Sequence, residues 1–482
     1  MKARLFLLVA VLLSASVHAA RRPNLVFILT DNHGAWTLGC YGNKDIRTPN
    51  LDRMAAEGAQ FMRAMASNPV CSPTRATYLT GLIPSQHGLH SFLDNKYMMG
   101  PEAYYTLKEF QTLPGILHSE GYVCGLSGKW HLGDNLNPQD GFSYWATMVR
   151  GSTGNMYEDP VIENGEVKQT PKYMTDLWTE HGIRFIEQNK DKPFFLYLAY
   201  NGPYCLGPLL LRPAQNRHAE YYADKDLLSF PRDTAHPWQY NNLAYHNNPV
   251  SIRRVAAEVS GIDDGVGAIL NTLKKHGLDE DTIVVFAGDQ GWMGGQNGFF
   301  GMGDHTRPFG AHDLMMQVPF IVRHPGGVKP GRPDMMIANY DFLPSVLDYM
   351  GLKNRIPQSP KLPGRSFAEV LRGGTMPWET RMFYEMEGTR SIRTEDWKYV
   401  ARRSPEGPGE LYDMKQDPHE RFNLFGQPGH KQRQQALATR LDGFFEEYAD
   451  PQYDIWKGGR SKARRLLAPP DHPDHRPLRP SQ

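Results

Sequence analysis

The sequence predicts an α/β fold, with a large, mostly parallel sheet sandwiched by helices and a smaller C-terminal α+β domain that contains a short antiparallel sheet. Three observations support this prediction. Short apolar segments rich in strand-forming residues each end in a polar loop, longer segments with helical periodicity lie between them, and the composition changes near residues 352–365. Strands that alternate with helices are typical of a parallel sheet covered on both faces.

The apolar segments are the expected strands. An unbroken apolar run of this length fits a strand buried on both faces. The first run breaks at a polar loop that begins with Thr30 and Asp31, and a later one breaks just before Asp289. Ligand groups gather at the carboxyl ends of parallel strands, so we expect these two acids to meet there. The predicted strands are residues 24–29, 194–199, 282–286 and 318–322.

The helical segments and the C-terminal domain follow from periodicity and composition. Residues 251–276 place apolar side chains at helical spacing, and Gly277 is a suitable stop. After the Pro-rich stretch 352–365, shorter strand-like pieces and one helical segment, residues 431–448, predict the α+β domain. The resulting division is a signal peptide at 1–19, a main domain at 20–364, the C-terminal domain at 365–450 and a flexible tail at 451–482.

The N-terminus has the pattern of an export signal. Lys2 and Arg4 precede the apolar run 5–13, and Val17-His18-Ala19 supplies small residues at the cleavage positions. The run is too short to span a bilayer, and no later stretch is long and apolar enough, so we expect a periplasmic or secreted protein without a stable membrane anchor. If Cys71 is used for chemistry, the three other cysteines, Cys40, Cys124 and Cys205, allow at most one internal disulfide.

The charge balance argues against a nucleic-acid partner. The chain has 53 Lys and Arg residues against 52 Asp and Glu residues, so it carries no general excess of positive charge. A local basic pocket for a small anion remains compatible with this balance.

Cys71 is the strongest candidate for a chemical role. It is followed by Pro73 and Arg75, and Pro73 suits the first turn of a helix. Cys71 would then lie at a helix N-terminus, where free N–H groups and the helix dipole favour anions. A buried structural cysteine is the alternative, and these residues alone leave both interpretations open.

The motifs together resemble the type I (formylglycine-dependent) sulfatases of the alkaline-phosphatase superfamily. The run from Cys71-Ser72-Pro73-Thr74-Arg75 to Thr80-Gly81 is similar to the family signature, and Gly128-Lys129-Trp130-His131 is similar to its second signature. The resemblance runs from about Pro23 to Tyr448. It implies an alkaline-phosphatase-like fold and hydrolysis of a sulfate monoester of an aryl group or a carbohydrate. It also implies that Cys71 is converted to formylglycine by a formylglycine-generating enzyme.

The resemblance also implies a calcium ion. Asp31 and Asn32 follow the first strand and Asp289 and Gln290 follow a later one, so four oxygen donors are available to a hard cation. Family members usually have more carboxylates at these positions. The amides at Asn32 and Gln290 are expected to weaken calcium binding.

The remaining site residues are assigned by resemblance. Lys129 would anchor the sulfate and the nucleophile, His131 would act as a base at the nucleophile, and Arg75 would hold the formylglycine hydrate. Tyr204 stands where the family usually has a histidine, and its ordinary pKa near 10 makes it a poor acid. Arg307 is the best candidate for the usual sulfate-binding lysine, and His305 is the alternative.

Two other functions remain open from the sequence. The same scaffold can hydrolyse phosphate or phosphonate esters, and a non-catalytic glycan-binding relative would explain the changed metal and acid positions. The substrate cannot be identified, although His87, His90, Asp94 and the insert 212–248 are candidates for lining its pocket.

Overall fold

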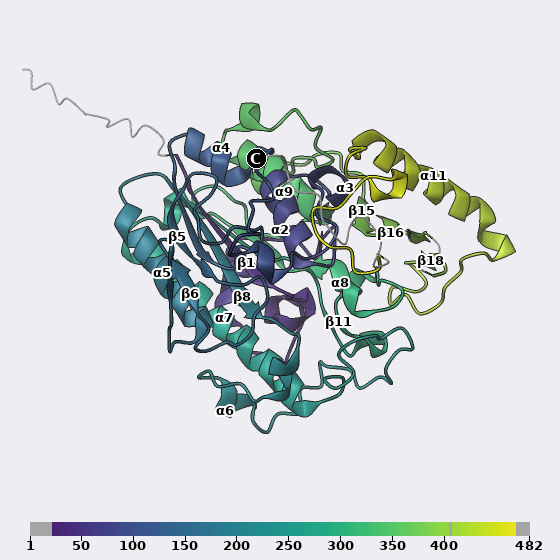
Figure 1. Ribbon diagram of the computed structural model, residues 1–482, viewed down its shortest axis with the longest axis horizontal. Coiled ribbons are helices and arrows are strands. Elements are labelled where there is room, and N and C mark those ends of the chain that lie inside the picture. The colour runs from purple at the N-terminus through teal and green to yellow at the C-terminus, as the bar shows by residue number, and fades with distance from the viewer. Residues whose placement is uncertain (1–21, 404–406, 469–482) are drawn as a thin grey trace, which may run out of the picture.

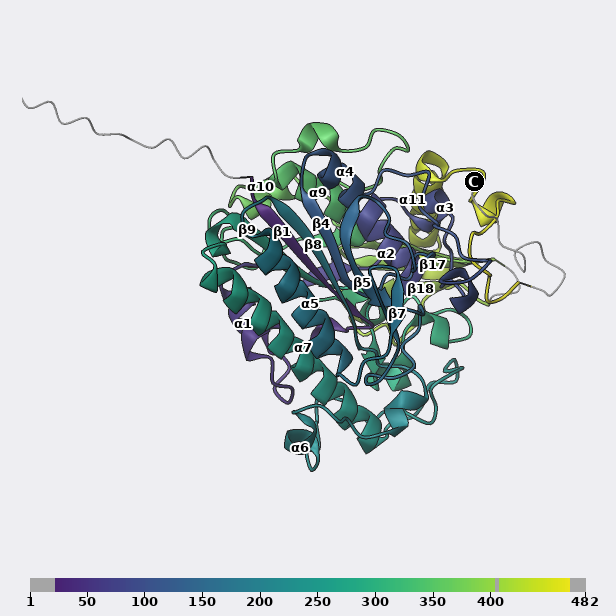
Figure 2. The same ribbon diagram turned by 60° about the vertical axis from the view of Figure 1, so that its left-hand side comes forward.

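The computed structural model describes residues 22–403 and 407–468. A nine-stranded sheet forms its centre (Figures 1 and 2). Its five middle strands are parallel, as expected, and the short strands at both edges are antiparallel. In order across the sheet the strands are β2 (Ala59–Gln60), β13 (Phe320–Arg323), β9 (Thr282–Gly288), β1 (Asn24–Asp31), β8 (Phe194–Pro203), β4 (Val123–Gly128), β5 (Phe142–Met148), β6 (Val161–Glu163) and β7 (Glu166–Lys168).

Helices cover both faces of this sheet, which explains why its central strands read as continuous apolar runs. In β1, Val26 and Ile28 face one hydrophobic cluster, whereas Phe27 and Leu29 face another. Figure 2 shows α5 and α7 in front of the sheet, with α2, α4 and α9 on the other side. The first layer is α1 (Pro49–Ala56), α5 (Met174–Asn189) and α7 (Pro249–Lys275), and the second is α2 (Cys71–Thr80), α4 (Leu113–Ser119) and α9 (Phe342–Tyr349).

Two local expectations have clear outcomes. Gly277 follows α7 with φ of +66°, a left-handed conformation that glycine adopts easily, so the predicted helix stop is confirmed. The single strand expected at residues 318–322 is wrong. Pro319, which has no backbone N–H, separates β12 (Gln317–Val318) from β13. Strand β12 joins a different, three-stranded sheet with β3 (Arg63–Met65) and β14 (Met336–Ala338).

The C-terminal region forms a separate antiparallel sheet against one helix, as the sequence predicted. The stacked rings of Phe383 and Phe444 lie 3.7 Å apart between sheet and helix. The four strands follow chain order, and Figure 1 shows them beside the main sheet under α11. These elements are β15 (Arg381–Met386), β16 (Thr389–Thr394), β17 (Trp397–Arg402), β18 (Glu410–Asp413) and α11 (Lys431–Tyr448).

The segment after α11 corrects the expectation of a flexible tail. Residues 451–468 pack back onto the molecule, and the side chains of Asp454 and Lys462 are buried. Lys462 pairs with Glu109 and donates from Nζ to the Thr106 carbonyl at 2.8 Å. The C-terminal segment, residues 451–468, is therefore part of the folded structure, and the rest of the expected tail lies outside the described residues.

Two further points concern export and the cysteines. The predicted signal peptide lies outside the described residues, and none of the helices that the structure describes is long and apolar enough to cross a membrane. All four cysteines are described and none forms a disulfide.

Candidate active site

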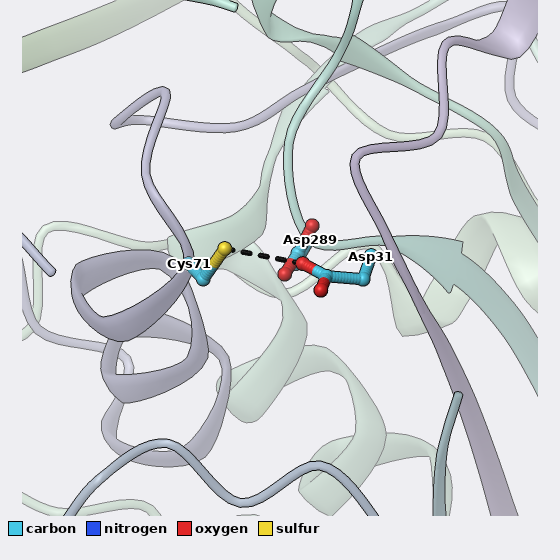
Figure 3. A group of neighbouring side chains, drawn as sticks. All are labelled: Asp31, Cys71 and Asp289. Atoms are coloured by element: carbon cyan, nitrogen blue, oxygen red, sulfur yellow. Dashed lines mark hydrogen bonds between the residues drawn. The ribbon is translucent and has the colours of Figure 1, made fainter. Parts of the chain in front are cut away.

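Cys71, Asp31 and Asp289 converge at the carboxyl end of the sheet (Figure 3). Asp31 is the last residue of β1, and Asp289 directly follows the neighbouring strand β9. Cys71 is the first residue of α2, as its position before Pro73 predicted. Its Sγ lies 3.1 Å from Oδ1 of Asp31, so the helix N-terminus brings the thiol directly to the strand-end acids.

Two buried cations complete this cluster. Arg75 lies one turn into α2 and donates from Nη2 to Oδ2 of Asp289 at 2.9 Å. Lys129 follows β4 and donates from Nζ to Oδ2 of Asp31 at 2.7 Å. Arg75 also donates from Nη1 to the Lys129 carbonyl at 2.8 Å, which ties helix and strand together. Two acids and two cations thus balance one another in the interior, as a buried charge cluster requires.

The cluster shifts the pKa values of its members in different directions. Burial opposes ionisation of Asp31, but Lys129 and Arg75 outweigh burial and lower its pKa. Burial and the neighbouring Asp31 raise the pKa of Asp289. Burial and the two acids also raise the pKa of the Cys71 thiol well above its usual value. An unmodified Cys71 is therefore held as a neutral thiol in this environment.

Asn32 and Gln290 stand beside the acids and supply amide groups. The Asn32 backbone N–H donates to Oδ1 of Asp289 at 2.9 Å, and the two amide side chains contact each other. Gln290 Nε2 also lies 3.2 Å from the sulfur of Cys71. Its Oε1 is buried and has no hydrogen-bond partner among the described residues. A buried, unpaired oxygen beside two carboxylates is a donor set that suits a hard cation.

His131 is held as a neutral base next to the cluster. Its Nε2 lies 3.1 Å from the Leu93 carbonyl, which can only accept, so Nε2 carries the proton and Nδ1 keeps its lone pair. Nδ1 is buried without a partner in the described structure, and burial together with Lys129 keeps the pKa of this imidazole well below its usual value. The ring packs directly on Gly151, where an added Cβ would lie 2.1 Å from it.

Three residues of this site have a left-handed backbone conformation. Asn32, His131 and Tyr204 all have positive φ, at 59°, 58° and 45°. Residues other than glycine rarely adopt positive φ, so the surrounding structure must hold these three residues in place.

A cavity of about 480 Å³ opens above the cluster. Cys71, Lys129, His131, Tyr204 and His305 all line it, so five of the candidate residues meet in one space. Arg307 does not line it. The Arg307 side chain instead donates to the Asp304 and Thr306 carbonyls and packs on Tyr240 and Phe309, with ring centroids 4.5 and 4.7 Å away.

Some of the residues that were predicted to line the substrate pocket do line it, and others do not. Asp94 lines the cavity, and the insert 212–248 contributes Asn241, Asn242 and Tyr245. His87 and His90 lie in the interior instead, where His90 Nε2 contacts the Tyr453 carbonyl at 2.8 Å. Asp304 also lines the cavity, although only its position next to His305 could have pointed to it.

Comparison with known proteins identifies the family. The sulfatase family profile matches residues 23–352, and a second profile, N-sulphoglucosamine sulphohydrolase, C-terminal, matches residues 308–447. The N-acetylglucosamine-6-O-sulfatase of Bacteroides thetaiotaomicron is 27% identical over 91% of this chain and 90% of its own length. The ulvan-active sulfatase of Formosa agariphila is 28% identical over 89% of this chain and 82% of its own length.

A solved structure agrees with these relatives. A protein in complex with its substrate, D-glucosamine-2-N,6-O-disulfate, superposes with a TM-score of 0.71 at 26% identity, covering 89% of this chain and 98% of that one. Sequence and fold therefore lead to one conclusion: the chain belongs to the sulfatase family of the alkaline-phosphatase superfamily and is a hydrolase of sulfuric esters.

Proposed function

We propose that this protein hydrolyses a sulfate monoester of a carbohydrate, using a formylglycine made from Cys71 and a bound calcium ion. One observation carries the proposal. Cys71 begins α2 at the floor of the cavity, with its Sγ 3.1 Å from Asp31 and with the charges of Lys129 and Arg75 in the same buried cluster. A nucleophile among fixed positive charges suits transfer of an anionic group.

Formylglycine, as its hydrate, would supply two hydroxyl groups on one carbon, one to attack sulfur and one to allow release of sulfate. The residues around position 71 fit such a group. Asp31 accepts a hydrogen bond there, and the unpaired Nδ1 of His131 offers a base at the same cavity. Lys129 and Arg75 would neutralise negative charge on the sulfuryl group as the ester bond breaks.

The same cluster fits calcium. Asp31, Asp289, Asn32 and Gln290 would hold the ion, which would draw charge from sulfate oxygens during the reaction. The buried and unpartnered Oε1 of Gln290 supports this assignment, because a metal would satisfy an oxygen that otherwise has no partner among the described residues. With only two carboxylates, which are also paired to Arg75 and Lys129, we expect a weak site.

The relatives guide the choice of substrate. One relative is named as an N-acetylglucosamine-6-O-sulfatase, one solved structure holds D-glucosamine-2-N,6-O-disulfate, and another relative is named for ulvan, so a sulfated glycan is the proposed substrate class. A cavity of about 480 Å³ lies in the range of small-ligand sites and can hold a sulfated sugar. An export signal and a separate formylglycine-generating enzyme belong to the same proposal, with a periplasmic or secreted location.

The first experiment tests the nucleophile. The protein is expressed with a formylglycine-generating enzyme, and the peptide that contains residue 71 is analysed by mass spectrometry. We expect an aldehyde or its hydrate at this position, and loss of turnover in Cys71→Ala. Cys124→Ala is the matched control, because Cys124 is also buried but lies in β4 away from the cavity. Active protein with an intact thiol at full occupancy would refute the proposed nucleophile.

The second experiment tests the reaction. Aryl sulfate, aryl phosphate and a panel of 6-O-sulfated hexosamines are compared at equal concentrations. We expect the sulfates to be preferred and at least one sugar sulfate to be hydrolysed. A higher kcat/KM for the phosphate would favour a phosphate or phosphonate ester hydrolase. Glycan binding without turnover of any ester in protein that carries the aldehyde would favour the non-catalytic alternative.

A further inference from the structure

The proposed reaction needs an acid that the expected position does not provide. When the ester bond breaks, the alcohol oxygen of a sugar must gain a proton, because a sugar alkoxide is a strong base and a poor leaving group. Tyr204 occupies the position expected for the acid, and its phenol has an ordinary pKa near 10. Lys129 lines the cavity as well, but its ammonium is already paired with Asp31 at 2.7 Å.

Asp304 is a carboxyl group that lines this cavity, and its Oδ1 lies 3.7 Å from Nε2 of His305. It lies in a short turn, Gly303–His305, is 6% exposed, and its Oδ1 has no hydrogen-bond partner in the described part of the chain. Burial raises the pKa of this carboxyl, which shifts it toward the protonated form. A buried carboxyl with a raised pKa is a known form of acid catalyst.

The turn that carries Asp304 is connected to the nucleophile. Met302 precedes the turn, and its sulfur lies 3.4 Å from Nε2 of Gln290. The same Nε2 lies 3.2 Å from the sulfur of Cys71. A short chain of contacts therefore runs from residue 71 to the turn, and Asp304 and Cys71 line one cavity.

Hydrogen bonds hold the neighbouring His305 in one tautomer. Its Nδ1 lies 3.4 Å from the Met302 backbone N–H and 3.0 Å from Nδ2 of Asn242. Nδ2 of Asn242 is identified as the amide nitrogen because it also faces the Phe300 carbonyl, at 3.2 Å. With two donors at Nδ1, that nitrogen accepts, so the ring proton lies on Nε2, which faces Asp304.

We propose that Asp304 is the acid that protonates the leaving oxygen of the substrate; this rests on the proposed function. As sulfur gains a bond to the nucleophile, its bond to the alcohol oxygen breaks and the electron pair passes to that oxygen. The proton of the Asp304 carboxyl moves to the same oxygen, so a neutral alcohol leaves and a carboxylate remains. Water in the open cavity returns a proton to Asp304 before the next turnover.

The test uses leaving groups of different basicity with the full-length, formylglycine-containing enzyme. 4-Nitrophenyl sulfate releases a weakly basic phenolate that needs little protonation, whereas a 6-O-sulfated sugar releases an alkoxide that needs a proton. In Asp304→Asn we expect kcat on the sugar sulfate to fall by about 10²–10⁴-fold, the usual contribution of an acid, and kcat on 4-nitrophenyl sulfate to change only a few-fold. Equal losses on both substrates, or none on the sugar sulfate, would overturn the proposal.

Control variants separate this role from a structural one. Asp94→Asn changes another acid of the same cavity, and any loss it causes should be the same for both leaving groups. Asp304→Ala is a second variant that removes the acid, and added formate should restore its turnover of the sugar sulfate. If this variant shows neither a selective loss on the sugar sulfate nor rescue by formate, Asp304 is not the acid. If the proposed function itself fails, the wild-type enzyme hydrolyses neither sulfate, an outcome that differs from every result above.

Discussion

Arg390 is the most informative position for testing how the molecule is held together. This residue of β16 is 4% exposed and donates to Oε1 of Glu385 at 2.6 Å and to Oδ1 of Asp454 at 2.7 Å. Its guanidinium also lies 3.7 Å from the ring centroid of Phe445. Oε2 of Glu385 in turn accepts from the Ser85 backbone N–H at 2.8 Å. One cation thus links the C-terminal sheet, the C-terminal segment 451–468 and the chain that follows α2.

The substitution Arg390→Leu keeps apolar bulk against Phe445 but removes the positive charge. Glu385 and Asp454 are each 1% exposed, so both would be left as buried carboxylates without their common partner. Breaking a buried ion pair by removing one partner costs about 3–5 kcal/mol, and we expect the free energy of unfolding to fall by that amount. Because 1.4 kcal/mol is a tenfold change in an equilibrium constant, the loss corresponds to a factor of at least about 10².

Urea unfolding followed by intrinsic fluorescence measures this change. Arg440→Leu is the matched control, because Arg440 makes its ion pair with Glu379 on the surface, with side chains 44% and 53% exposed. Exposed pairs of this kind contribute about 0–1 kcal/mol. If Arg390→Leu destabilised the protein no more than Arg440→Leu, the three-way link would not be a source of stability and the reasoning from burial would be wrong.

Three other predictions concern charge and metal. Lys129→Met should lower kcat/KM on a sulfate ester by about 10²–10³-fold while the folded state persists, since it removes a preorganised charge from the site, and a smaller loss would remove Lys129 from the chemistry. Chelation of divalent ions should lower both activity and the melting temperature, with recovery on adding calcium; an unchanged melting temperature would argue against a bound ion. Burial raises the pKa of Glu258 from 4.5 to about 7, although Arg254 and Tyr173 oppose the rise. Between pH 4.5 and pH 7, Glu258 is therefore more protonated in the folded state than in the unfolded state. Stability should therefore fall by at most about 3 kcal/mol as pH rises from 4.5 to 7, and Glu258→Gln should remove this part of the pH dependence in urea unfolding at pH 5 and pH 8.

The sequence predicted the parts of the site that follow from strand ends and helix starts. Asp31 and Asp289 end neighbouring parallel strands, so their meeting depends only on the sheet, and Cys71 depends only on Pro73 beginning a helix. Arg307 shows where such reasoning stops. Its spacing from the Val318-Pro319 pair placed it near the site, but a long side chain can turn back, and this one binds the carbonyls of its own loop.

The contacts that sequence could not reveal are those between distant parts of the chain. The composition after residue 450, rich in Pro, Arg and His, is typical of a mobile tail. Lys462 is nevertheless buried, because Glu109, more than 350 positions earlier in the chain, provides its partner. Asp304 was missed for a related reason, since no local pattern distinguishes a buried acid from an ordinary turn residue.

The packing of the C-terminal segment onto the molecule affects when Cys71 would be accessible to another protein. All ten residues of α2 are buried, and the chain after α11 hydrogen-bonds to Ser85 and Gly88, just beyond α2. In the folded protein, Cys71 is only 5% exposed and is reached through the cavity described above. A separate enzyme that modified Cys71 would therefore need access to it before α2 packs into the interior, and modification would compete with folding.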